Sequence, residues 1–109
     1  MESTRLKENR QFKPEKMQKI PLFETDKMFC DQYCLLPGQA QRVHTHDSED
    51  KIYVVLEGEA LFDIGDEQET YTEGNAVIAR ASVPHGVKND SQEKLVLLVV
   101  MAPRPDKHS

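Results

Sequence analysis

Residues 51–64 read KIYVVLEGEALFDI, and this stretch decides the fold class. The run Lys51 to Leu56 is rich in β-branched and aromatic residues, and Ala60 to Ile64 resumes the apolar content after Glu57-Gly58-Glu59. Two such runs joined by a short turn that contains glycine are typical of a β-hairpin. We therefore expect a pair of antiparallel strands here.

Turn residues recur roughly every 8–12 residues outward from this hairpin, and they separate short β runs. No helical period is sustained after the first fifteen residues. The pattern predicts an all-β sandwich or barrel, and closing the sheet is one way to remove exposed strand edges. The turns and runs are Gly65-Asp66, Glu73-Gly74-Asn75, Ala76 to Ala79, His85 to Lys88, Asn89-Asp90 and Leu95 to Met101.

The length of 109 residues suits a single domain with one hydrophobic core. We expect a polar, solvated N-terminal arm over residues 1–15, the β domain over 16–103 and a polar C-terminal tail over 104–109. The net charge of −5 argues against a nucleic-acid partner. The longest apolar run, Leu95 to Ala102, is much shorter than the roughly 20 residues that cross a bilayer, so we expect no membrane partner. Because residues 1–10 do not resemble a signal peptide, we expect a cytoplasmic protein.

The two cysteines, Cys30 and Cys34, lie in a stretch that we expect to be a strand. In a strand their Cα atoms are about 13 Å apart, beyond the ~7 Å limit for a disulfide. They are therefore expected to be free thiols. A metal-binding role is the alternative, but no second Cys/His pair at zinc-site spacing accompanies them.

The tripeptide His44-Thr45-His46 carries the strongest chemical signal. On a strand, residues i and i+2 point to the same face, so both imidazoles could bind one cation at roughly 2.0–2.1 Å. Two histidines at this spacing are also common as exposed polar residues. The tripeptide alone does not decide between a metal site and a polar surface.

Two sets of glycine, histidine and asparagine spacings extend this signal. The first set is Gly38, His44, His46 and Gly58, with five residues between Gly38 and His44. The second set is Gly74, His85 and Asn89, separated by ten and three residues. Both sets resemble the two sequence motifs of the cupin superfamily. The resemblance runs from Asp31 to Ala102, and fifteen residues, 59–73, separate the motifs.

This resemblance implies the small jelly-roll β-barrel of the cupins and a site for one divalent transition metal. His44, His46 and His85 take the positions of the family's histidine ligands. The metal could be Fe, Mn, Ni, Zn or Cu, because imidazole suits each of them. Ligand histidines must be neutral, so metal binding is expected to weaken below about pH 6.5.

The chain departs from the family at the usual fourth ligand, a glutamate with six residues between it and the closing Gly58. Lys51 stands there, and an ammonium group repels a nearby dication. Strand alternation puts Glu49 on the same face as Lys51, but Glu49 lies further along the strand and could reach the metal only from that more distant position. Asp50 lies on the opposite face and could reach the metal only if a β-bulge turned it inward. The alternative is a three-histidine site with open coordination positions, as in family members resembling thiol and diketone dioxygenases. A catalytic metal needs such open positions.

Three further residues are candidates for a substrate pocket. Lys51 could pair with an anionic substrate, or it could extend into solvent from the barrel mouth. Tyr53 could line the cavity or fill the core. Arg80 could bind a carboxylate at the rim or be a solvated loop residue. His108, in the tail, matches no motif.

The cupin resemblance leaves two classes of function open, because this fold serves many activities. The first is a metal-dependent enzyme that acts on a small polar organic substrate, with dioxygenase-type chemistry as the leading hypothesis. The alternative is a non-catalytic small-molecule-binding or sensor protein. The sequence identifies no catalytic residue, and the resemblance implies a homodimer.

Overall fold

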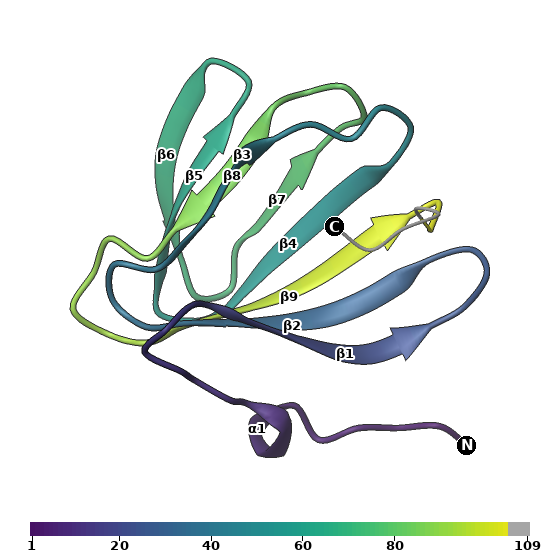
Figure 1. The fold of residues 1–109 in the computed structure, drawn as a ribbon, viewed down its shortest axis with the longest axis horizontal. Helices are drawn as coiled ribbons and strands as arrows, with labels where there is room; N and C mark the ends of the chain where they lie inside the picture. Colours follow the sequence, from purple (N-terminus) through teal and green to yellow (C-terminus); the bar gives the residue numbers. More distant parts are fainter. Residues whose placement is uncertain (105–109) are drawn as a thin grey trace.

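Two antiparallel β-sheets packed face to face make up most of the protein in the computed structural model, which describes residues 1–104 (Figure 1). This confirms the predicted all-β jelly-roll class. The elements are α1 (Leu6–Asn9), β1 (Gln18–Glu24), β2 (Phe29–Leu35), β3 (Ala40–His44), β4 (Asp50–Glu57), β5 (Glu59–Ile64), β6 (Glu67–Thr72), β7 (Ala76–Ala79), β8 (His85–Lys88) and β9 (Leu95–Ala102).

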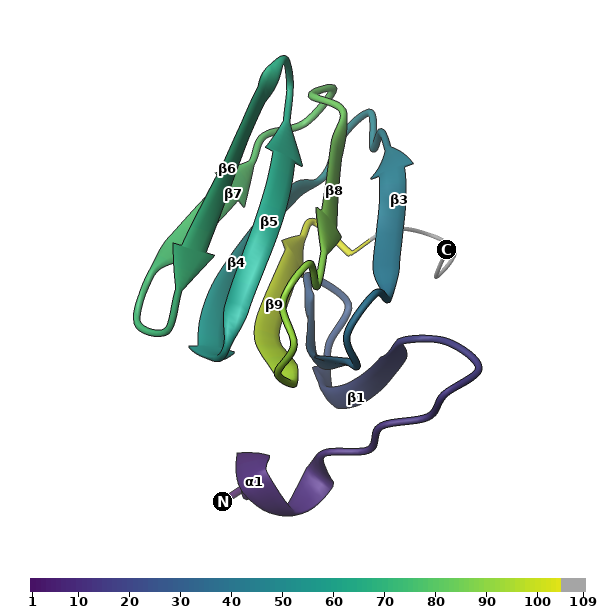
Figure 2. The same cartoon turned by 90° about the vertical axis from the view of Figure 1, so that its left-hand side faces the viewer.

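The strand order places the predicted hairpin across the two sheets. One sheet has the order β1-β2-β9-β4-β7 and the other β3-β8-β5-β6, so β4 and β5 lie in different sheets. The turn at Gly58 therefore carries the chain from one sheet to the other rather than closing a hairpin. Figure 2 shows β6, β5, β8 and β3 as one layer of the sandwich.

Hydrogen-bonded strands do not join the two sheets into a closed barrel, so the expected closure is wrong. Two of the four edge strands, β1 and β6, carry features that protect an edge in other ways. β1 contains Pro21 and an irregular register between Pro21 and Phe23, and β6 carries the charged Glu67 and Glu69 on exposed positions. Proline, irregular register and charge each discourage pairing of an edge with another chain. These two edges are therefore disfavoured as sites of pairing although the sheets do not close.

The core lies between the sheets and follows strand alternation. On β4 the buried side chains are Lys51, Tyr53 and Val55, at every second position. The rings of Tyr53 on β4 and Phe62 on β5 lie 5.2 Å apart, which joins the two layers. β9, in the middle of the five-stranded sheet, supplies Leu95, Leu97, Val99 and Met101 to the core.

The N-terminal arm, residues 1–15, is exposed along most of its length but is attached to the domain at several points. Arg10 Nη1 lies 2.7 Å from Glu57 Oε1 on β4. The side-chain amide of Gln32 on β2 donates to the carbonyl of Leu6 in α1 at 2.9 Å. These bonds hold the arm beside the five-stranded sheet.

Two other sequence predictions have a structural outcome. Cys34 is buried, Cys30 is half-buried, and both are free thiols as predicted. Within residues 1–104, no helix combines the length and the apolar character required to cross a membrane. The prediction for His108 concerns a residue outside the described part of the chain.

Candidate metal centre

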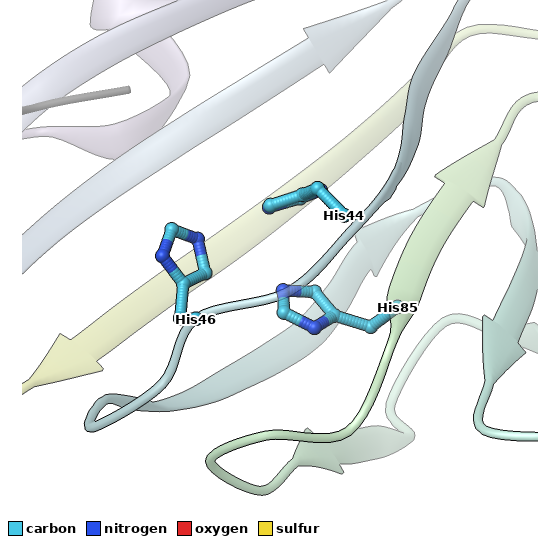
Figure 3. A group of neighbouring side chains, drawn as sticks. All are labelled: His44, His46 and His85. Carbon is cyan, nitrogen blue, oxygen red and sulfur yellow. The ribbon is translucent and has the colours of Figure 1, made fainter.

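Three histidines meet at one end of the four-stranded sheet (Figure 3). His44 ends β3, His85 begins β8, and the two are partners in the ladder between these strands. Their possible ligand atoms and those of His46 all lie within 4.8 Å of one another. The predicted convergence of the three side chains is therefore confirmed.

The route to this convergence differs from the strand argument. β3 ends at His44, so His46 belongs to the following loop and not to the same strand. The other half of the geometry comes from Gly86, next to His85. A Cβ atom at Gly86 would lie 2.9 Å from both the carbonyl oxygen of Gln41 and the amide nitrogen of Val43. Only glycine permits this close approach of β8 to β3, which brings His85 beside His44.

Hydrogen bonds fix which nitrogen of each ring is available. His44 Nδ1 lies 2.7 Å from the carbonyl oxygen of Arg42, and His85 Nδ1 lies 2.9 Å from that of Val83. A carbonyl can only accept, so each Nδ1 carries the proton and each Nε2 keeps its lone pair. His46 Nδ1 faces Glu49 Oε1 at 3.5 Å. In this arrangement Nδ1 interacts with the protein and Nε2 keeps a lone pair that it can donate to a metal ion, which is usual for histidines that bind metals.

The surroundings of the three rings fit a divalent transition metal. His85 Nε2 is buried and has no hydrogen-bond partner among residues 1–104. Buried polar atoms are nearly always partnered, and a metal ion bound by the three rings would supply the partner that this lone pair lacks. Burial lowers the pKa of His85 to about 4 and also lowers the pKa of His44 and of His46. All three imidazoles are therefore neutral at pH 7, as metal ligands must be.

The two acidic candidates for a fourth ligand do not join the three-histidine group. Glu49 lies beside Nδ1 of His46, where it orients the ring. Asp50 is exposed, and its Oδ1 accepts a hydrogen bond from the backbone amide of Ala81 at 2.8 Å. Within residues 1–104, the group of side chains that could hold a metal ion therefore consists of three imidazoles without a carboxylate.

Lys51 is buried, which rules out the solvent-exposed orientation considered from the sequence. Its relative exposure is 1%. Its Nζ donates to Gln41 Oε1 at 3.0 Å and lies 5.2 and 5.0 Å from the ring centroids of Tyr33 and Tyr53. Burial first, and then the charge of Lys19, lowers the pKa of Lys51 to about 7.

A cavity of about 480 Å³ adjoins the histidine group. Its lining includes His46, Lys51, Tyr33 and Gln41, so the cavity extends from the candidate metal centre to the buried lysine. The sequence did not indicate Tyr33 or Gln41. The remaining pocket candidates lie elsewhere. Tyr53 is in the core, where its hydroxyl donates to Gln41 at 3.2 Å, and Arg80 is exposed and outside the lining.

Comparisons with known proteins agree with this geometry. The cupin domain family matches residues 32–101, whereas none of the curated proteins matches. A solved structure from Thermus thermophilus is 50% identical, with 96% of this chain and 100% of that chain covered and a TM-score of 0.93. An RmlC-like cupin from Desulfovibrio desulfuricans is 29% identical, with 96% and 99% covered and a TM-score of 0.85. A predicted oxalate decarboxylase from Thermotoga maritima is 21% identical over 80% of each chain, has a TM-score of 0.76 and shows similarity of fold alone.

Proposed function

We propose that this chain, which belongs to the cupin family, binds one divalent transition metal through His44, His46 and His85 and acts on a small polar organic molecule in the adjoining cavity. The observation that carries the proposal is the buried Nε2 of His85, which has no partner among residues 1–104. Leaving such an atom unsatisfied costs about 1–3 kcal/mol. A bound metal ion would remove this cost.

The residues around the site hold the three donors in place. The carbonyl groups of Arg42 and Val83 fix the ring orientation of His44 and His85, and Glu49 does the same for His46. With three protein ligands, a bound ion would keep open positions at which it could polarise a substrate or activate O₂. We therefore favour dioxygenase-type chemistry, with Fe, Mn, Ni, Zn and Cu as the candidate metals.

Metal analysis of the purified protein tests the proposal. After reconstitution with each candidate ion, we expect one ion per chain in the wild type and a large loss in His85→Ala. Asp50→Asn is the matched control, because Asp50 is close in sequence but bonded to the backbone of Ala81, and it should keep the metal. Near-zero metal in the wild type under all reconstitution conditions would refute the proposal.

A non-catalytic small-molecule-binding or sensor protein is the second candidate. It is favoured by the lining of the cavity, whose one carboxylate within residues 1–104, that of Asp31, already has a partner. Proton transfer in the cavity would therefore depend on Lys51 or His46 and not on a carboxylate. Oxygen consumption with a panel of thiols, diketones and sugar acids separates the two candidates. Turnover supports the enzyme, whereas saturable binding without turnover supports the sensor.

The outer face of the five-stranded sheet supports the expected homodimer. Ile52 on β4 and Ile78 on β7 are ladder partners, and 41% and 40% of their surfaces are exposed. The half-exposed Val54, Leu98 and Val100 share this face. An exposed apolar patch of this kind is typical of an interface. Light scattering would show a dimer for the wild type and a monomer for Ile52→Lys, while a monomeric wild type would contradict the proposal.

A further inference from the structure

The buried ammonium group of Lys51 points to the class of molecule that the cavity accepts. We infer that the cavity binds the carboxylate of a small organic acid, which the Lys51 ammonium and the Tyr33 hydroxyl hold in place. The inference rests on the proposed function for its setting, because it names the substrate or ligand class of the same site. It depends on groups other than the three histidines, so it can be tested separately.

Lys51 has unused capacity to bind an anion. Lysine is almost never fully buried unless it is paired, yet among residues 1–104 Lys51 forms no ion pair. Its ammonium has three N–H donors, and the described residues use one of them, in the hydrogen bond to Gln41. The two tyrosine rings stabilise the cation through their faces but do not neutralise it. The Lys51 side chain lines the cavity, so an anion there could accept hydrogen bonds from the remaining N–H donors.

The amide of Gln41 makes a second donor available to the same anion. Its Oε1 accepts from Lys51, which can only donate, and from the hydroxyl of Tyr53. The Nε2 group must then point the other way, and it donates to Tyr33 Oη at 3.5 Å. Tyr33 Oη is therefore an acceptor in this bond and retains its own proton for donation. Burial raises the pKa of Tyr33 well above its ordinary value, so the proton stays on the oxygen.

The charge of the lining favours an anion with a single negative charge. Lys16, Lys19 and Lys51 line the cavity, whereas the carboxylate of Asp31 is the one acidic group in its described lining. This excess of positive charge occurs in a chain with a net charge of −5, so it is a local feature that raises the concentration of anions. Asp31 would repel a second negative charge on the ligand.

The number of donors and the size of the cavity favour a carboxylate. A carboxylate has two oxygens, which match one ammonium group and one hydroxyl group, whereas phosphate and sulfate carry more oxygens and more charge than these two groups can satisfy. A cavity of about 480 Å³ has the size of a small-molecule site. His46 lines the same cavity, so the remainder of the acid would extend toward the histidine group.

Calorimetric titration of the chelator-treated 109-residue chain at pH 6, where the Lys51 amine carries its proton, tests the inference. The probes are acetate and pyruvate, with acetamide as the neutral analogue of acetate and with sulfate and phosphate as other anions. We expect saturable binding of the carboxylates that is at least about 10-fold tighter than binding of acetamide, since a charge-assisted hydrogen bond contributes about 1.5–3 kcal/mol. Sulfate and phosphate should bind more weakly than pyruvate.

Three variants locate the binding groups. Lys51→Met should weaken pyruvate binding by at least about 10-fold, and Tyr33→Phe, which keeps the packing of the ring, by about 3- to 10-fold. Lys27→Met is the matched control, because Lys27 is exposed and lies outside the lining of the cavity, and it should change the affinity less than about 2-fold. If Lys51→Met does not fold, Tyr33→Phe and the acetamide comparison still decide the result.

Four results would overturn the inference: no carboxylate binding by the wild type, unchanged binding in Lys51→Met and Tyr33→Phe, equal loss in Lys27→Met, or tighter binding of sulfate or phosphate. Failure of the metal proposal looks different. If the protein holds no metal but binds pyruvate through Lys51, the inference stands and the proposed metal centre does not. If the three histidines bind metal but the Lys51 and Tyr33 variants keep full pyruvate affinity, the proposed metal centre stands and the inference does not.

Discussion

Replacement of Lys51 by methionine removes a buried charge and keeps an unbranched side chain of similar length. We expect the variant to unfold with a larger free energy than the wild type at pH 6, because an ammonium group without an ion pair is costly to bury. The hydrogen bond to Gln41 is lost, but Gln41 Oε1 still accepts one from Tyr53. The advantage of the variant should depend on pH, which identifies the charge as its source.

The pKa of Lys51 gives the size of this dependence. Burial, followed by the charge of Lys19, lowers the pKa from 10.5 to about 7. Between these values the unfolded chain binds the proton and the folded chain does not, so wild-type stability rises with pH in this window, and the cost of the charge is full below pH 7. At 1.36 kcal/mol for each pKa unit, the wild type regains about 2.7 kcal/mol between pH 6 and pH 9. The advantage of Lys51→Met should shrink by the same amount.

Urea unfolding at pH 6 and pH 9, with chelator and equal protein concentrations, measures this change. With a slope of about 1.5 kcal/mol/M, the difference between the two unfolding midpoints should fall by roughly 1.8 M. Lys27→Met is the matched control, because Lys27 is exposed and its removal should give no such pH dependence. A Lys51→Met advantage that is the same at both pH values would refute the reasoning, as would a wild type that is more stable at pH 6.

Four further predictions concern the turns, the core and the metal. A Cβ atom at Gly58 would overlap the carbonyl oxygen of Lys94, whereas a Cβ atom at Gly74, which also has positive φ, would meet nothing within 4 Å. In urea unfolding we therefore expect Gly58→Ala to lower the free energy of unfolding by at least about 3 kcal/mol and Gly74→Ala by about 1 kcal/mol. Equal losses in the two variants would contradict this prediction. In the same assay Asn89→Ala should cost about 2–4 kcal/mol, because the buried Asn89 amide donates to two backbone carbonyls, and a cost below about 1 kcal/mol would show that these bonds are unimportant. Glu49→Gln should weaken metal binding about 10-fold in competition with a chromophoric chelator, and unchanged affinity would exclude its orienting role. Because burial lowers the pKa of all three histidines, protons should displace the metal only below about pH 6.5, and release centred above that pH in a titration would be inconsistent with the site.

The fold was predictable where a strand carries its own hydrophobic pattern. β7 and β8 begin and end at the predicted residues, and β9 covers the apolar run Leu95 to Ala102. β6 was not predicted, because its sequence EQETYT is polar on both faces and exists as a strand only through its ladder with β5. β1 was missed for a related reason, since Pro21 interrupts its pattern. Edge strands depend on their neighbours, and a local pattern does not contain that information.

The candidate site was predictable to the extent that residue spacing defines it. The three histidines follow from motif spacing, and the structure brings them together. The partners of Lys51 did not follow, because β9 separates β4 from β2, the strand that carries Tyr33, and Gln41 lies on the opposite sheet. Strand order and sheet packing set these contacts. The sequence showed an unusual lysine but not the buried network around it.

The division of the site between the two sheets has a mechanical consequence. His44 and His85 belong to the four-stranded sheet, whereas Lys51 and Tyr33 belong to the five-stranded sheet. A metal ion alone would stabilise the four-stranded sheet. An organic acid that contacted both the metal and Lys51 would link the two sheets to each other. Amide hydrogen exchange would register the difference, with slower exchange in β3 and β8 for the ion and in β2 and β4 as well for the acid. The rate of amide exchange in both sheets would then report whether the site is occupied by the metal and the acid together.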